Sequence, residues 1–179
     1  MKRLSTNNIV LSGLFIALGF LLPFLTGQIP SIGSRLLPMH IPVMLCGFIC
    51  GWPYGIIVGF ITPLFRSVVF GTPPMYPTAV AMAFELAAYG FASGFMYELL
   101  CNRSISKNIS IYISLIFSMV CGRIIWGMAS YILYGLRGTA FTWERFVARA
   151  FIDAVPGIII QVIIIPVIII ALRRAKVFG

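Results

Sequence analysis

Five ionised residues stand inside long apolar segments of this chain: Arg66, Glu85, Arg123, Arg149 and Asp153. A charged side chain in a membrane helix costs about 2.5–3.5 kcal/mol even on the most permissive insertion scale, so it normally faces protein, water or a ligand. Three cations against two anions leave one positive charge in excess, which a carboxylate ligand would neutralise. The alternative is that Arg66–Glu85 and Arg123–Asp153 are structural ion pairs between helices.

Polar and aromatic side chains extend this set at helical spacing. Residues three, four or seven positions apart share one face of a helix. Small-molecule sites usually combine such a mainly apolar and aromatic lining with a few convergent polar groups. The residues predicted to contact a ligand are Arg66, Glu85, Tyr89, Arg123, Trp126, Ser130, Arg149, Asp153 and Gln161.

The composition defines the class of protein. Of the 179 residues 60% are hydrophobic and only 9% charged, and the mean hydropathy is +1.05, which excludes a water-soluble domain and indicates a polytopic membrane protein. The net charge of +9 does not imply nucleic acid, because most Lys and Arg residues flank apolar segments. One histidine and four cysteines without a Cys-x-x-Cys pair exclude the usual zinc patterns, and we expect no metal or other cofactor.

Hydrophobic runs long enough to span a bilayer, about 20 residues each, divide the chain into elements. They predict one all-α domain over residues 1–179, a bundle of six transmembrane helices. The second helix is short for a full span, and Trp52-Pro53 is expected to turn the chain tightly into the third. The expected ranges are 7–25, 38–51, 54–70, 78–100, 109–134 and 147–172.

The distribution of Lys and Arg predicts the orientation. One side holds three arginines, with Arg149 at its edge, and the other holds Lys2, Arg3, Arg103, Lys107, Arg173, Arg174 and Lys176. The richer side is cytoplasmic by the positive-inside rule, so both termini are expected inside. Three long loops then face outward, and we interpret them as a lid. Its expected gating residues are Gln28, Arg35, His40, Pro73, Pro74 and Tyr76. For His40 the alternative is a satisfied histidine at a helix start.

Small residues on the first helix predict a contact with a partner. Gly13 and Ala17 lie four positions apart on one face, and such a face lets another helix approach closely in lipid. The sequence contains no nucleotide-binding P-loop, no metalloprotease motif and no nucleophile elbow. The chain is therefore not expected to be an enzyme, and a partner would have to supply the energy for concentrating a solute.

Together these features resemble the substrate-binding S components of energy-coupling factor (ECF) vitamin transporters. The resemblance covers nearly the whole chain and includes the number of spans and the Gly13/Ala17 face. It rests further on the segments L-P-M-H-I-P-V-M-L-C-G-F-I-C-G, F-G-T-P-P, F-E-L-A-A-Y-G and P-G-I-I-I-Q.

The resemblance implies a six-helix bundle in a prokaryotic cell membrane that binds a vitamin near the outer face, beneath the lid. It implies a transmembrane T subunit and two ATPases as partners, with the T subunit docking on the small-residue face of the first helix. That face is A-x-x-x-A in the family, whereas Gly13 takes its first position here; a smaller residue should still permit docking. The family is thought to release substrate inside by toppling in the membrane.

The ligand and two other functions stay open at this point. The positive excess favours pantothenate, whose carboxylate needs a cation, while cobalamin and a pyridoxine-type vitamin are alternatives. A self-sufficient proton-coupled carrier of a small organic anion would use Glu85 or Asp153 as its proton site. An integral membrane enzyme acting on lipid is the weakest candidate, because the sequence offers no metal-ligand or nucleophile constellation.

Overall fold

The computed structural model describes residues 6–25, 36–103, 105–138, 142, 144, 147–148 and 154–175, and these residues contain no strand. Five of the helices are long and apolar enough to cross a membrane, whereas α3, with 11 residues, is not. The all-α prediction is thus confirmed. Five helices of spanning length lie in the described residues, and the prediction of six spans stays a prediction. The elements are α1 (Thr6–Leu25), α3 (His40–Cys50), α4 (Trp52–Phe70), η1 (Met75–Ala79), α5 (Val80–Asn102), α6 (Lys107–Leu136) and α8 (Val155–Arg174).

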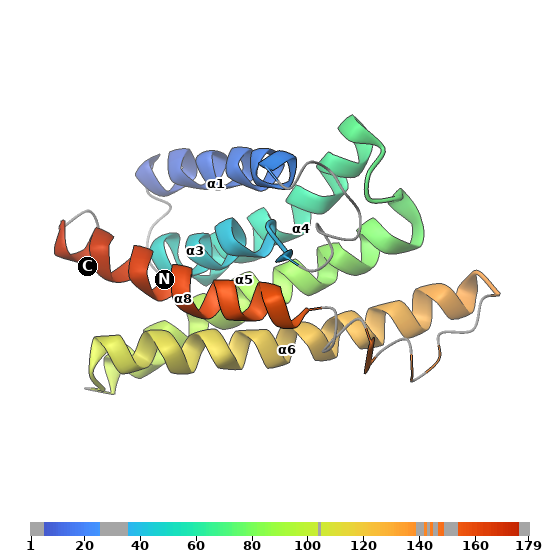
Figure 1. Cartoon of the computed structure of the whole chain (residues 1–179). Helices are drawn as coiled ribbons and strands as arrows, with labels where there is room; N and C mark the ends of the chain where they lie inside the picture. Colours follow the sequence, from blue (N-terminus) through green and yellow to red (C-terminus); the bar gives the residue numbers. More distant parts are fainter. Residues whose placement is uncertain are drawn as a thin grey trace.

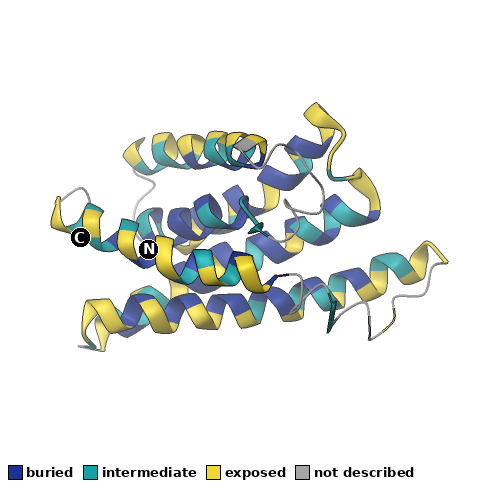
Figure 2. Ribbon diagram, in the orientation of Figure 1, coloured by how far each residue is buried: buried dark blue, intermediate teal, exposed yellow. Residues whose placement is uncertain are grey.

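The helices lie side by side with α5 in the middle of the bundle. In Figure 1, α1 lies at the top and α6 at the bottom, with α3 and α5 between them. Helix α5 packs directly against α3, α4 and α6. Figure 2 shows buried residues on the faces that look inward and exposed residues on the outer faces, as expected for a bundle whose outer surface meets lipid.

Close contact between glycines brings α4 against α5. Gly55 of α4 and Gly90 of α5 approach so closely that a Cβ on either would overlap the backbone of the other, and a Cβ on Gly47 of α3 would also strike Gly90. Helices in lipid gain stability mainly from such packing, since burial of apolar surface against another helix is no better than burial in lipid. The glycines thereby fix the position of α5, the helix that carries Glu85 and Tyr89.

Two helix boundaries differ from those expected. Gly51, with φ of 99°, makes the junction between α3 and α4, and Trp52 and Pro53 open α4 instead of forming the turn. The last helix begins at Val155, not at residue 147, with Pro156 in its first turn, where the missing N–H costs nothing. The sequence analysis extended this helix over Arg149 and Asp153, and these two residues lie outside the part of the chain that the structure describes.

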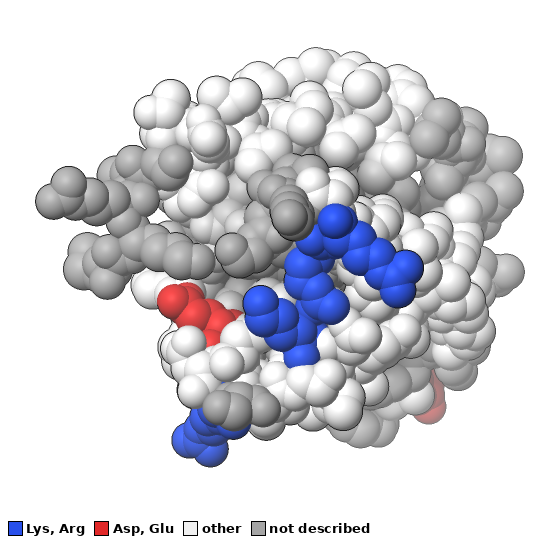
Figure 3. Space-filling view, turned by 90° about the vertical axis from the view of Figure 1, so that its left-hand side faces the viewer, with Lys and Arg blue, Asp and Glu red and all other residues white. Residues whose placement is uncertain are grey.

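Basic side chains gather at one end of the bundle, where α1 starts and α8 finishes. Figure 3 looks onto this end and shows Lys and Arg side chains close together. We call it the basic end. Lys2, Arg3 and Lys176 lie outside the described part of the chain, which contributes Arg103, Lys107, Arg173 and Arg174.

A single methyl group at the α4–α5 crossing should destabilise the bundle. In Gly55→Ala the new Cβ meets the Gly90 backbone, which cannot rotate away, and overpacking of this kind costs about 1–3 kcal/mol. We expect a lower midpoint of thermal unfolding in detergent. Gly135→Ala is the matched control, because nothing lies within 4 Å of a Cβ there. Equal midpoints for the two variants would contradict the crossing.

Candidate substrate-binding site

A buried ion pair joins α5 to α6 in the interior of the bundle. Arg123 Nη1 donates a hydrogen bond of 3.0 Å to Glu85 Oε1. Glu85 is only 2% exposed and Arg123 8%, so each charge depends on the other for compensation. The structure thus pairs Glu85 with Arg123 and not with Arg66, the partner considered in the sequence analysis.

His40, at the first turn of α3, completes this network. Its Nε2 lies 3.4 Å from the same Glu85 oxygen, and its ring meets the ring of Tyr89 edge-to-face at a centroid separation of 4.9 Å. His40 is 1% exposed. His40 is therefore a buried partner of the ion pair. It does not lie in an exposed loop, and its contacts extend beyond the start of its own helix.

Tyr89 is held in place by a glycine on the neighbouring helix. Its ring covers Gly122 of α6, where a Cβ would overlap the aromatic carbons. Tyr89 lies one turn beyond Glu85 on α5, so the two side chains share a face. The bare backbone at Gly122 allows the tyrosine to reach the helix that also carries Arg123.

Arg123 uses only part of its hydrogen-bonding capacity. Its Nε and Nη2 are buried and have no hydrogen-bond partner among the residues that the structure describes, and the same holds for His40 Nδ1 and for Ser130 Oγ further along α6. Buried polar groups are usually satisfied, so an unpaired group in a native structure requires an explanation. The Nε and Nη2 groups of a guanidinium point the same way and can together receive a planar carboxylate.

The predicted residues on α8 and on the half of α6 that is remote from the basic end lie nearby in the fold. Trp126 is buried against Ala81, the second residue of α5. Gln161 of α8 is buried, and its Nε2 donates a 3.5 Å hydrogen bond to the carbonyl oxygen of Leu37, just before α3. Helix α8 is thereby joined to the segment that leads into His40.

Arg66 lies apart from this network. Its Nη1 donates a 3.0 Å hydrogen bond to the carbonyl oxygen of Phe20 on α1, and its guanidinium lies over the rings of Phe24 and Phe70, 5.4 and 5.5 Å from their centroids. Cation–π contacts of this type stabilise a cation without a carboxylate. Without Arg66, two of the cations counted in the sequence analysis face two anions, so the excess of one positive charge no longer supports an anionic ligand.

The predicted gating residues fall into two groups. In the loop between α4 and α5, Pro74 and Tyr76 are exposed and Pro73 is half-buried, and the Tyr76 hydroxyl donates a 3.0 Å hydrogen bond to the carbonyl oxygen of Leu133 on α6. Gln28 and Arg35 lie outside the residues that the structure describes.

Gly13 and Ala17 lie on the outer face of α1, and both are exposed. A Cβ on Gly13 would have no atom within 4 Å. These small residues therefore make no helix contact within the described part of the bundle, which leaves their face accessible.

Two features of the site escaped the sequence analysis. His40 and Glu85 lie 45 positions apart, and no local spacing links them; the only signal was that each is a rare titratable residue within an apolar segment. The aromatic set around Arg66 also escaped, although three phenylalanines at the facing ends of α1 and α4 were visible in the sequence: Phe20, Phe24 and Phe70.

The comparison with known proteins assigns the family. A family model described as "ECF transporter, substrate-specific component" matches residues 7–172, which is nearly the whole chain. Searches of curated proteins and of solved structures found no match. A match of this extent agrees with the all-helical bundle, its membrane-length helices and the resemblance seen in the sequence. The chain belongs to the substrate-specific components of ECF transporters.

Proposed function

We propose that this S component binds a small water-soluble vitamin or precursor through a carboxylate, with pantothenate as the best candidate. The proposal rests on the Nε and Nη2 edge of Arg123, which is buried and has no hydrogen-bond partner within the described part of the chain. Because the Nη1 group already pairs with Glu85, the guanidinium is fixed in orientation before a ligand arrives. A carboxylate meeting this edge would form two charge-assisted hydrogen bonds.

The other polar groups of the network suit the remainder of such a ligand. His40 Nδ1 and Ser130 Oγ are buried and have no partner in the residues described. They would pair with hydroxyl or amide groups of the ligand, while Tyr89 and Trp126 supply apolar surface. Arg149, Asp153 and Gln161 stay in the proposal as further contacts near the start of α8. Arg66 is better explained as a link between α1 and α4, given its contacts with Phe20, Phe24 and Phe70.

In this proposal the protein is a binding subunit and not an enzyme, and it works in the cytoplasmic membrane of a prokaryote. The basic end faces the cytoplasm, consistent with the positive-inside rule, and the loop that bears Pro73, Pro74 and Tyr76 faces outward, together with Gln28 and Arg35, as part of a lid. A T subunit that docks on Gly13 and Ala17 of α1, and two ATPases, would supply the energy for inward delivery.

Ligand affinity should depend on the forked shape of Arg123 as well as on its charge. We expect Arg123→Lys to weaken pantothenate binding more than tenfold, at least about 1.4 kcal/mol, because a lysine cannot offer two parallel donors. Isothermal titration of the purified protein measures this. Arg137→Lys, an exposed position at the end of the same helix, should bind as the wild type does. Unchanged affinity in Arg123→Lys would remove the basis of the site.

Glu85 should affect ligand affinity by orienting the side chain of Arg123. In Glu85→Gln the guanidinium loses its charged partner and its fixed orientation, so we expect pantothenate affinity to fall by about tenfold while the protein still folds. A circular dichroism melt of the same sample separates loss of binding from loss of structure. Full affinity in a folded Glu85→Gln protein would show that the ion pair has no role in the site.

A bulky residue on the exposed face of α1 should separate transport from binding. Ala17→Trp is expected to abolish uptake and co-purification with the T subunit, because helices in lipid need small residues to approach closely, but to leave pantothenate affinity intact. Ile124→Trp, on an exposed face of α6, is the control. Uptake driven by a proton gradient in proteoliposomes without ATPases would instead support the secondary carrier.

A further inference from the structure

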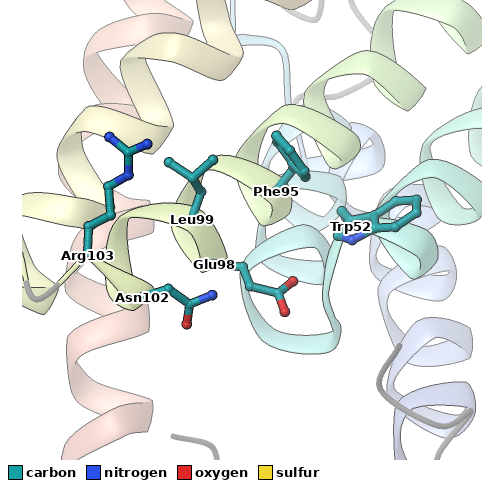
Figure 4. A pocket seen from close by; sticks show the side chains of 6 residues that line it. All are labelled: Trp52, Phe95, Glu98, Leu99, Asn102 and Arg103. Atoms are coloured by element: carbon teal, nitrogen blue, oxygen red, sulfur yellow. The ribbon is translucent and has the colours of Figure 1, made fainter.

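A pocket lies at the basic end, between the start of α4 and the end of α5 (Figure 4). Its volume is about 410 Å³. The 13 residues from Glu85 to Glu98 correspond to roughly 20 Å along α5, so the pocket is separate from the Glu85–Arg123 site. It is lined by Trp52, Phe95, Glu98, Leu99, Asn102 and Arg103.

The apolar wall of this pocket belongs to the outer surface of the bundle. The rings of Phe91 and Phe95 stack with centroids 5.2 Å apart, and Trp52 meets Phe91 edge-to-face at 5.7 Å. All three side chains are exposed, and on membrane-spanning helices exposed aromatic rings contact lipid, with Trp favoured at the level of the headgroups. The aromatic surface therefore continues from the pocket residues Trp52 and Phe95 to Phe91, which lies one helical turn further from the basic end on α5.

The polar part of the pocket presents an unpaired negative charge. Glu98 is exposed, and neither of the salt bridges within the described residues includes it, although four basic residues occupy the same end. In Figure 4 its carboxylate points toward the side where Trp52 stands, while Asn102 lies on the opposite side and the Arg103 guanidinium is turned away. A small cation placed there would meet a carboxylate and an aromatic face together.

We propose that this pocket binds a phospholipid whose headgroup carries a primary ammonium, such as phosphatidylethanolamine. The ammonium group would donate hydrogen bonds to Glu98 and contact the Trp52 ring. The phosphate would lie toward the Asn102 amide and the side of Arg103, and an acyl chain would follow Phe95 and Phe91. A lipid accounts for the pocket better than a cationic protein side chain does, because the aromatic wall continues away from the polar groups along the lipid-facing surface of α5.

The test uses the full-length protein in nanodiscs of equal parts phosphatidylethanolamine and phosphatidylglycerol. Native mass spectrometry at rising collision energy counts the lipids that remain bound. The wild type should retain phosphatidylethanolamine preferentially, and Glu98→Gln should lower that preference by about tenfold. Glu144→Gln is the matched control, since Glu144 is an exposed carboxylate far from α5 in the sequence, and it should behave as the wild type does.

Two further arms identify the chemistry of the site. Replacing phosphatidylethanolamine by phosphatidylcholine, whose ammonium has no N–H groups, should reduce retention by the wild type but not by Glu98→Gln. Trp52→Leu should weaken retention in both lipid mixtures. Equal retention by the wild type and Glu98→Gln would overturn the proposal, and so would a Glu98→Gln protein that keeps its lipid but no longer co-purifies with partner subunits, because the pocket would then hold a cationic side chain of a protein.

Discussion

A carboxylate in the interior of an apolar bundle is the constraint on which this structure depends. Glu85 is almost fully buried, and leaving one member of a buried ion pair unpaired costs about 3–5 kcal/mol. Arg123 and His40 must therefore stay within reach of one oxygen atom, which fixes α6 and α3 relative to α5. The glycine contacts at Gly55–Gly90 and Gly122–Tyr89 make the necessary short separations between helices possible.

The same constraint links stability to ligand selection. If all donors of the guanidinium bound Glu85, the side chain could stabilise the fold but could not bind a ligand. If none did, the side chain would be poorly oriented. Arg123 uses one nitrogen to bind Glu85, and its other two nitrogens are buried without a hydrogen-bond partner among the described residues. A ligand that completes this arrangement gains two hydrogen bonds without having to order the side chain first, because the ion pair has already done so.

The sequence predicted the class of fold, but it did not predict which of the candidate residues would be neighbours. Hydrophobic length located α1 and α4 to within two residues because the polar residues and glycines that end them are local signals. The start of α8 was misplaced since the apolar run continues upstream of it, although Pro156 marks a first helical turn. The sequence analysis placed Arg66 in the same site as Glu85 because the two were expected at a similar depth in the membrane. The direction in which the Arg66 side chain points depends on packing against α1, and no local sequence pattern shows this packing. The contact between His40 and Glu85 joins segments 45 positions apart and requires the tertiary fold.

Hydrogen bonds attach helix α1 to the rest of the bundle near both of its ends. Asn8 Nδ2 donates a hydrogen bond to the Cys50 carbonyl oxygen at the basic end, and the Phe20 carbonyl accepts one from Arg66 near the opposite end. Between these points Gly13 and Ala17 remain on the outer face. Separating α1 from the bundle at either end would break one of these hydrogen bonds. A movement of α1 that keeps both bonds must carry the end of α3 and the Arg66 region of α4 along with it.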